Sequence, residues 1–310
     1  MSEPLRLGPA EVGALLGLRE EAAERHLVRC APDLRYVTLC REERDATVLR
    51  VVQTLHSGDL QRAGPARSPV WEAGWRENLE EIRKQGFRSD LLRPRYFRRD
   101  LVRYDGDWVR PLGPLFETDL FGVIRGAVFE RYLPDPESIV ELGCGTGANL
   151  LDLAELCPRA ELVGCDWATS SQELLEVISA EIGREIRGVH FDMFDPHGSA
   201  PLPGGKGCSV LTVHAFEQLG VDFGPMLEYL LALAPERCVQ IEPIAELYDP
   251  DLLHDWLALE YHRRRGYLDG YLDALRALER AGRVEIEQAR RVRFGSLFHE
   301  GYNLLVWRVR

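Results

Sequence analysis

Three alternating glycines follow a short apolar run in the middle of the chain. Gly143, Gly145 and Gly147 come directly after the run 139–142. Glycine adopts positive φ easily and lets a ligand approach where another residue would place a Cβ atom. An apolar-periodic segment from Ala148 follows. The pattern therefore predicts a strand, a tight loop and a helix whose first N–H groups face a polar or anionic ligand.

The string Glu141-Leu142-Gly143-Cys144-Gly145-Thr146-Gly147 resembles motif I of the class I S-adenosylmethionine (SAM) methyltransferases. The same stretch fits the dinucleotide pattern G-x-G-x-x-G/A, with Ala148 as its last member. Two features favour SAM, namely the acid two residues before the first glycine and a first strand that begins near residue 138. The resemblance implies that the cofactor S-adenosyl-L-methionine is bound by Glu141, Gly143, Cys144, Gly145 and Gly147.

A second apolar run, 162–165, ends on Asp166. A carboxylate at the end of such a strand can accept hydrogen bonds from both hydroxyls of a ribose. The alternative is that Asp166 caps the helix predicted after Ala168. The stretch is also similar to the second SAM-binding segment of the methyltransferases, which implies that Trp167 flanks the adenine.

A third strand is predicted over 186–191, and Asp192 and Met193 follow it. The resemblance implies that Asp192 accepts a hydrogen bond from the adenine amino group and that the backbone N–H of Met193 meets the ring. The alternative is an aspartate that stabilises the turn before Pro196.

His214 and Glu217 follow the fourth predicted strand, 208–213. Ligands of open α/β sheets gather at the carboxyl ends of the strands, so His214 is expected near the cofactor and near the methyl group. Histidine titrates near neutrality and can take a proton from a methyl acceptor. His214 and Glu217 are therefore the candidate catalytic residues, and the alternative for His214 is packing against SAM.

Residues 88–110 contain seven arginines and four aspartates, with Tyr96 and Phe97 among them. One interpretation is a clamp for a carboxylate or phosphate of the substrate. The other is a solvated face with ion pairs between domains. The arginines are Arg88, Arg93, Arg95, Arg98, Arg99, Arg103 and Arg110.

The remaining pattern predicts an α/β fold with a Rossmann-like seven-stranded methyltransferase sheet and a helical N-terminal region. Helices are expected near 9–11, over 19–30, 41–56 and 70–85, and another over 116–132 before the first strand. Residues 1–114 are expected to form a lid, a substrate-binding region or an oligomerisation region, and residues 115–310 the SAM-binding domain. The last two strands, 284–294 and 301–309, are joined by the short connector 295–300, which predicts an antiparallel pair. A nicotinamide-binding half has no such ending.

The chain of 310 residues has a formal net charge of −12, which opposes general attraction to nucleic-acid phosphates. Its seven cysteines include no C-x-x-C pair, and the N-terminus lacks a secretory signal, so we expect reduced thiols, a cytoplasmic location and no metal site. No membrane association is expected. A homodimer through the N-terminal helices is a further expectation.

These observations predict SAM-dependent methyl transfer to an oxygen, nitrogen or carbon atom of a small molecule, with natural-product tailoring as one setting. No Asn-Pro-Pro-Tyr type motif follows the fourth strand, which disfavours amide and adenine nitrogen acceptors. Two alternatives remain: methylation of a protein or RNA, and a SAM- or nicotinamide-binding protein that transfers no methyl group.

Overall fold

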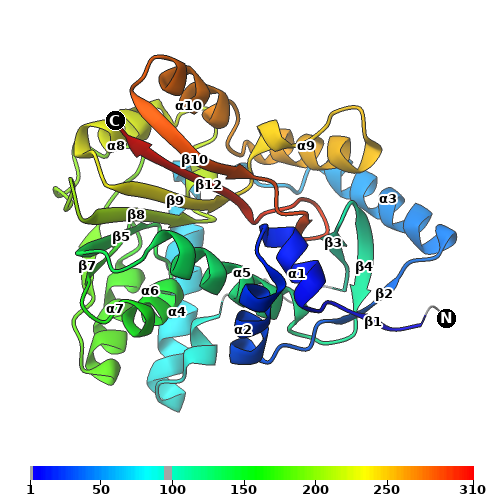
Figure 1. Cartoon of the computed structure of the whole chain (residues 1–310), viewed down its shortest axis with the longest axis horizontal. Coiled ribbons are helices and arrows are strands. Elements are labelled where there is room, and N and C mark those ends of the chain that lie inside the picture. Colours follow the sequence, from blue (N-terminus) through cyan, green and yellow to red (C-terminus); the bar gives the residue numbers. More distant parts are fainter. Residues whose placement is uncertain (1–2, 94–99) are drawn as a thin grey trace.

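The structure is a computed structural model that describes residues 3–93 and 100–310. Seven strands form the larger of two sheets (Figure 1), in the order β10-β12-β9-β8-β5-β6-β7. Their bounds are β5 Ser138–Leu142, β6 Glu161–Asp166, β7 Arg187–His190, β8 Cys208–Val213, β9 Arg237–Glu242, β10 Val284–Arg290 and β12 Asn303–Val309.

The direction of the last strand defines the topology of this sheet. Strands β7, β6, β5, β8 and β9 pair in parallel. Strand β12 lies between β9 and β10 and is antiparallel to both. The predicted Rossmann-like sheet with a reversed last strand is therefore confirmed.

Helices cover both faces of the large sheet, which explains why its central strands are continuous apolar runs. All five residues of β5 are buried. One core lies between the sheet and the helices α5 (Phe116–Tyr132), α6 (Ala148–Leu156) and α7 (Thr169–Ile182). The other lies under α8 (Gly224–Leu233) and α10 (Tyr271–Arg280). Among the described residues, no helix combines the length and apolarity needed to cross a bilayer.

The N-terminal region contains the expected helices and, in addition, strands. The helices are α1 Pro9–Leu16, α2 Glu20–Cys30, α3 Arg41–His56 and α4 Ser68–Gln85. The strands are β1 Leu5–Arg6, β2 Arg35–Thr38, β3 Val102–Tyr104 and β4 Asp107–Pro111. These strands and β11 (Phe294–Gly295) form a second sheet in the order β1-β2-β4-β3-β11. Residues 1–114 are thus a mixed region rather than a helical one.

The second sheet is joined to the large one through the C-terminal part of the chain. Asp105 and Gly106 both have positive φ and close the β3–β4 hairpin, as a two-residue turn requires. Strand β11 pairs with β3 and comes from the connector between β10 and β12. This connector spans 291–302, longer than the expected 295–300, because it leaves the large sheet to extend the small one.

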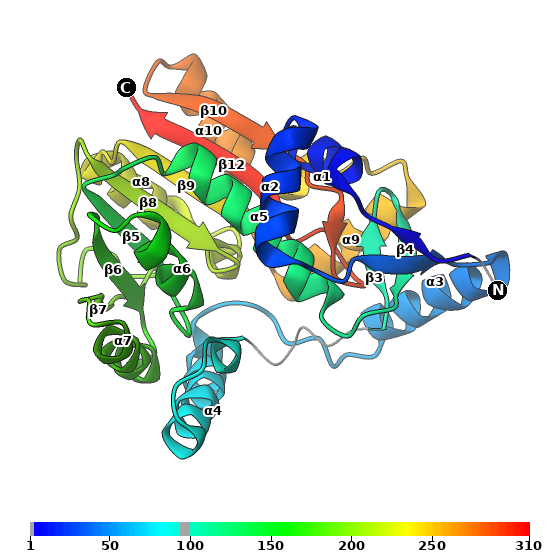
Figure 2. The ribbon, with the colours of Figure 1, turned by 60° about the horizontal axis from the view of Figure 1, so that its bottom comes forward.

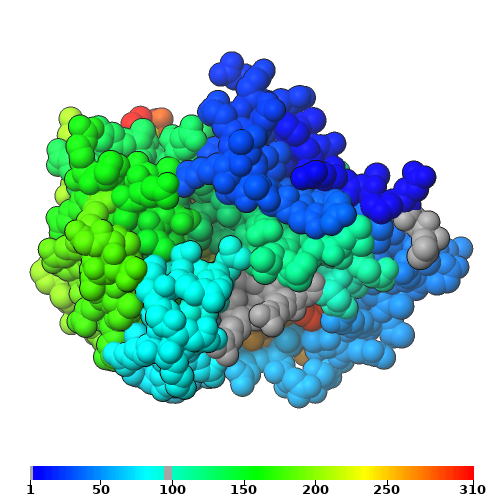
Figure 3. Space-filling view, turned by 90° about the horizontal axis from the view of Figure 1, so that it is seen from below, coloured from blue at the N-terminus to red at the C-terminus, as the bar shows by residue number. Residues whose placement is uncertain are grey.

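The predicted break in the long segment 251–282 is confirmed. Helix α9 (Leu253–Arg265) ends at Gly266, whose φ is +63°. Helix α10 begins after Gly270, whose φ is +81°. Helix α4 stands apart from the large sheet in Figure 2 and packs against α7. Figure 3 shows α4 on the surface beside the light-green segment that contains α7.

Candidate active site

The glycine loop turns tightly around the end of β6. The N–H groups of Gly143 and Cys144 both donate to the Cys165 carbonyl, at 2.7 and 3.0 Å. The N–H of Gly145 donates to Asp166 Oδ2 at 2.9 Å. Gly143, Gly145 and Gly147 have φ values of +71°, +54° and +79°, which L-residues with a side chain rarely adopt. The loop therefore needs glycine for its conformation.

The three glycines differ in what surrounds them. A Cβ on Gly143 would lie 2.3 Å from Ala215 Cβ, and one on Gly145 would lie 3.0 Å from the ring of Trp75. Both glycines line a pocket. A Cβ on Gly147 would instead meet Leu175 and Ile178 of α7 at 2.6 and 2.8 Å. Gly147 thus serves the packing of the loop against α7 and does not line the pocket.

The pocket lies at the carboxyl ends of β5, β6 and β8, under α4. It contains several of the predicted cofactor residues, namely Gly143, Cys144, Gly145, Asp166, Trp167, Met193 and His214. Aromatic rings form much of its wall: Trp71, Trp75, Phe121, Trp167, Phe191 and Phe194. Trp71 and Trp75 stack at 5.4 Å, and Trp167 stacks on Phe194 at 5.9 Å. Such a pocket suits a flat, apolar ring with polar substituents.

Asp166 lies at the bottom of the pocket and is nearly completely buried. Its Oδ2 accepts from Gly145 and its Oδ1 accepts from the Ala168 N–H, both at 2.9 Å. Burial raises the pKa of this carboxyl to about 6, although these hydrogen bonds oppose the increase. The hydrogen bond to Ala168 orders the turn before α7, but it does not cap the helix, whose N-terminus has no side-chain cap. Each oxygen of Asp166 keeps a further lone pair for a ligand hydroxyl.

Glu141 is placed behind the pocket wall rather than on it. Its Oε1 accepts from Asn149 Nδ2 at 2.5 Å, and its buried Oε2 has no hydrogen-bond partner. Burial raises the pKa of Glu141 to about 8, although the hydrogen bond from Asn149 opposes the increase. Asn149 in turn accepts from Arg125, which also donates to Asp152. Glu141 thus orients Asn149 and Arg125, and these two side chains do line the pocket.

Asp192 and Met193 follow β7 as expected, with different surroundings. Met193 lines the pocket. Asp192 Oδ1 accepts from the Phe194 N–H at 2.9 Å, as in a turn stabilised by its own aspartate. Asp192 is not among the residues that line the pocket. Its role toward adenine stays a prediction.

His214 follows β8 directly and has a φ of +53°, in the left-handed region. Its Nδ1 lies 3.7 Å from Glu217 Oε2, and its buried Nε2 has no hydrogen-bond partner. Burial lowers the pKa of His214, but contact with Glu217 and the nearby charge of Glu242 outweigh burial, so the pKa lies above its ordinary value.

Glu242, at the end of β9, holds the segment that carries both candidate catalytic residues. This buried carboxylate accepts from the N–H groups of Ala215, Phe216 and Glu217 at 3.0 to 3.2 Å. Burial raises the pKa of Glu242 to about 7. Glu242 contacts backbone and neither cavity, so it is a positioning residue.

A second cavity of about 440 Å³ adjoins the pocket. His214, Trp71 and Trp75 line both spaces. Glu217 lines only the second cavity. Its other walls come from α4, the end of α9 and the connector 291–302. His214 therefore lies where the glycine-loop pocket, of about 130 Å³, meets the second cavity, and Glu217 lies beside it on the second cavity.

The arginine-rich stretch does not line this second cavity with its described residues. Arg88 pairs with Asp90, and Arg110 pairs with Glu43. Arg103 is buried, with Nη1 2.9 Å from His254 Nδ1 and its guanidinium over the Trp108 ring. Arg88 and Arg110 thus form exposed ion pairs within residues 1–114, and Arg103 is buried, so these three arginines form neither a clamp at the cavity nor ion pairs between domains. Arg95, Tyr96, Phe97, Arg98 and Arg99 lie outside the described residues.

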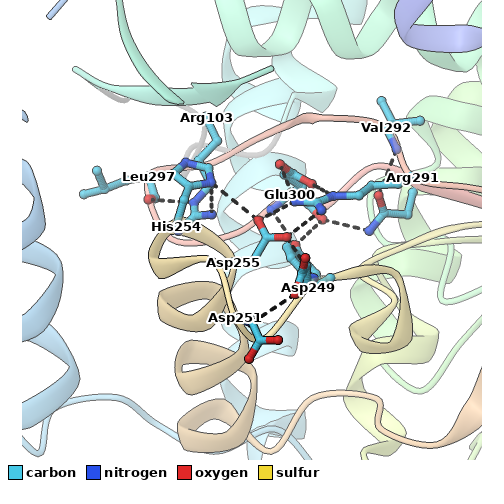
Figure 4. A network of polar contacts seen from close by, with 11 residues as sticks. Arg103, Asp249, Asp251, His254, Asp255, Arg291, Val292, Leu297 and Glu300 are labelled. Carbon is cyan, nitrogen blue, oxygen red and sulfur yellow. Dashed lines mark hydrogen bonds and ion pairs between the residues drawn. The ribbon is translucent and has the colours of Figure 1, made fainter. Parts of the chain in front are cut away.

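His254, Asp255 and Glu300 lie close enough together to hold a metal ion, but an arginine already occupies their centre. Figure 4 shows Arg291 between the two carboxylates. Its nitrogens donate to both oxygens of Asp255 at 2.6 Å and to both oxygens of Glu300 at 2.6 and 3.1 Å. A guanidinium thus fills the place of a cation, and the group is structural.

Solved structures share the arrangement of this chain, while no family model matches it. The [4+2]-cyclase SpnF aligns over 80% of this chain and 97% of its own length, with a TM-score of 0.51 and 12% identity. The O-methyltransferase NcsB1 from neocarzinostatin biosynthesis aligns over 98% of this chain and 90% of its own length, with a TM-score of 0.41 and 15% identity. A geranyl diphosphate C-methyltransferase from Streptomyces coelicolor A3(2) aligns over 64% of this chain and 84% of its own length, with a TM-score of 0.45 and 13% identity.

The chain has the Rossmann-like fold of the class I methyltransferases. The same fold serves a cyclase, so the fold alone does not decide the reaction. The reaction has to be argued from the two cavities and the residues between them.

Proposed function

We propose that this protein transfers a methyl group from SAM to a small molecule. The observation that carries this proposal is the position of His214, which lines both the glycine-loop pocket and the second cavity. A methyl transferase needs a donor site and an acceptor site that meet at the reacting atoms. The second cavity, at about 440 Å³, lies within the range of about 300–1,000 Å³ that small-molecule sites occupy.

The residues of the first pocket are suited to SAM. Gly143 and Gly145 bring the loop backbone to the surface of the pocket, where a Cβ would crowd Ala215 or Trp75, and Trp167 offers a flat apolar wall. Asp166 offers carboxylate oxygens to the ribose hydroxyls. Arg125 lines the pocket, and its buried Nε has no hydrogen-bond partner, which suits a carboxylate such as that of the methionine group.

When bound, SAM supplies a methyl group on a positively charged sulfur, which leaves by in-line displacement. The contribution of this chain is alignment, exclusion of water and removal of a proton. Trp71 and Trp75 line both spaces, and their apolar rings would exclude water from the junction. His214 can accept a proton from an acceptor hydroxyl or amine, and Glu217 stabilises the imidazolium that forms.

The two alternatives are separated by direct measurements. Calorimetry with SAM, S-adenosylhomocysteine and NAD tests the cofactor, because a nicotinamide enzyme would bind only the last. Filter binding of labelled methyl groups tests transfer to protein or RNA. We expect binding of SAM and S-adenosylhomocysteine, no binding of NAD, and label only in small molecules. The net charge of −12 supports the last expectation.

Gly145→Val is expected to weaken SAM binding about 10- to 100-fold, because the added carbons overfill a packed site. The Cβ would lie 3.0 Å from the ring of Trp75, which lines the same pocket. Calorimetry measures the change. Gly183→Val is the matched control: Gly183 has a similar φ of +65° but no atom within 4 Å of its Cβ position. Unchanged SAM affinity in a folded Gly145→Val protein would contradict the assignment of the loop.

Asp166→Ala is expected to weaken SAM binding by about 1.5–3 kcal/mol, the usual size for losing hydrogen bonds to a charged group. Asp166→Asn keeps the shape of the side chain and should give an intermediate loss. Because Asp166 also accepts from Gly145 and Ala168, thermal unfolding of both variants must be followed in parallel. If both variants bound SAM as tightly as the wild type, Asp166 would not contact the cofactor.

We also propose a cytoplasmic location, because all seven cysteines are free thiols and five of them are buried. A homodimer through the N-terminal helices remains a prediction that analytical ultracentrifugation would test.

A further inference from the structure

Two arginines face the second cavity from elements far apart in the sequence. Arg67 ends the short helix Pro65–Arg67 before α4, and Arg265 is the last residue of α9. The Ala63 N–H donates to the Arg265 carbonyl at 2.6 Å, which fastens the loop before α4 to the end of α9. The fold thus brings two guanidinium groups to one wall of a cavity that already adjoins His214.

Arg67 is held in place without a carboxylate. Its guanidinium lies 4.8 Å from the centre of the Trp71 ring, and its buried Nε has no hydrogen-bond partner. Burial lowers the pKa of Arg67, and the positive charge of Arg265 lowers it further. Two like charges in a partly buried place repel each other, so an anion between them would be stabilised.

Arg265 is more firmly fixed than Arg67. Its Nη1 donates to the Gln61 carbonyl and its Nη2 to Tyr267 Oη, while its buried Nε has no partner. Within the ranges 3–93 and 100–310, no carboxylate forms an ion pair with Arg67 or Arg265. Glu217, on the same cavity, accepts from Gln218 and faces His214. Neither arginine is therefore held in a contact ion pair by the described part of the chain, while the negative charge of Glu217 acts on both of them across the cavity.

The space between this wall and His214 is bounded by flat rings. Trp71 and Trp75 stack on one side, and Tyr261 and Tyr267 meet edge to face at 5.9 Å on another. Aromatic walls bind planar rings, and a pair of arginines recognises a carboxylate through parallel N–H donors.

We propose that the methyl acceptor is an aromatic carboxylic acid, whose carboxylate binds Arg67 and Arg265 and whose nucleophilic group faces His214. This inference rests on the proposed function, and it names the substrate class of the same site. It uses neither the arginines of 88–110 nor any metal.

The test measures how tightly the full chain binds hydroxylated benzoates, cinnamates and naphthoates. Each acid is compared with its own methyl ester, and each measurement is made with and without S-adenosylhomocysteine. Quenching of tryptophan fluorescence reports binding, because Trp71 and Trp75 line the cavity. We expect at least one acid to bind about tenfold more tightly than its ester. Arg67→Gln should weaken that acid about 10- to 100-fold and leave its ester unchanged.

Controls keep the result specific to the cavity. Arg67→Lys retains charge without the planar fork and should give an intermediate loss. Arg264→Gln, at an exposed position of the same helix as Arg265, should change nothing. Thermal unfolding checks that each variant is folded.

The proposal is overturned if every ester binds as tightly as its acid, if Arg67→Gln weakens acid and ester equally, or if aryl phosphates bind more tightly than all of the acids. Failure of the proposed function is a separate result, since it would show as no binding of S-adenosylhomocysteine by the wild-type protein.

Discussion

Replacement of His214 by asparagine is expected to lower turnover about 10²- to 10⁴-fold, the usual contribution of a general base, while SAM affinity stays nearly unchanged. Asparagine is the suitable replacement because it tolerates the left-handed backbone that His214 adopts at φ +53°. The measurement is the turnover of the acceptor that the wild-type protein methylates, beside calorimetry with SAM. Glu217→Gln should lower turnover less, because its carboxylate acts through His214.

The pH profile distinguishes a base from a packing residue. A base works only when deprotonated, so the rate should rise with pH through the pKa of His214 and fall away below it. That pKa lies above 6.5, because contact with Glu217 and the charge of Glu242 outweigh the effect of burial. Glu217→Gln removes the nearest negative charge and should shift the rising limb to lower pH. A shift in this direction is not expected if Glu217 only shapes the cavity.

Turnover within about threefold of the wild-type rate in His214→Asn would mean that alignment alone carries the reaction. Glu77, Glu117 and His299 also line the second cavity and would be the next proton acceptors to test. His262 is buried, and burial lowers its pKa to about 3. Its Nε2 contacts His299 rather than the space beside the pocket. Glu242 is committed to three backbone N–H groups.

The sequence predicted the large sheet because its strands are buried on both faces and therefore stand out as apolar runs between turn residues. The second sheet was missed for the opposite reason. Strands β1 and β11 have two residues each, and β3 contains an arginine. One signal was present: Asp105-Gly106 between short β-prone segments is typical of a hairpin turn. The arginines beside this turn make the flanking segments more polar than the apolar runs of the large sheet.

The candidate site was predictable as far as it is built from strand ends. The glycine loop, Asp166, Trp167, Met193 and His214 meet because parallel strands end at one edge of the sheet. Arg67, Arg125 and Arg265 come from helices or from the turn before a helix, and only tertiary packing brings them to a cavity. Trp71, Trp75, Leu79 and Ile82 recur at helical spacing, which is typical of one buried face of a helix. In the structure only Leu79 and Ile82 of these four are fully buried in the core, while the two tryptophans line the cavities.

Arg291 holds a buried network that anchors the connector 291–302 to α9. Its guanidinium bridges Asp255 and Glu300, whose side chains are 3% and 0% exposed, and lies over the Tyr248 ring at 4.7 Å. Burial raises the pKa of Asp255, but hydrogen bonds from His254 and Arg291 outweigh it and hold this pKa well below its usual range. Two carboxylates this deeply buried depend on a positive partner.

Arg291→Ala is therefore expected to lower the free energy of unfolding by about 3–5 kcal/mol, because it leaves buried charges uncompensated. Urea unfolding at neutral pH measures the loss. Arg308→Ala is the matched control, since Arg308 and its partner Glu285 have side chains that are 46% and 33% exposed. Exposed pairs contribute about 0–1 kcal/mol. Equal losses in the two variants would show that the buried network does not stabilise the fold.

The sign of the pH dependence gives an independent check. A depressed pKa in the folded state means that Asp255 contributes stability above its unfolded pKa of about 3.9, and that this stability is lost as the pH falls. Without Arg291 the pKa of Asp255 should rise, so the variant loses less stability on acidification. The difference between wild type and Arg291→Ala should therefore shrink as the pH falls through about 4 and below. A constant difference would place the effect of Arg291 in packing on Tyr248 rather than in its charge.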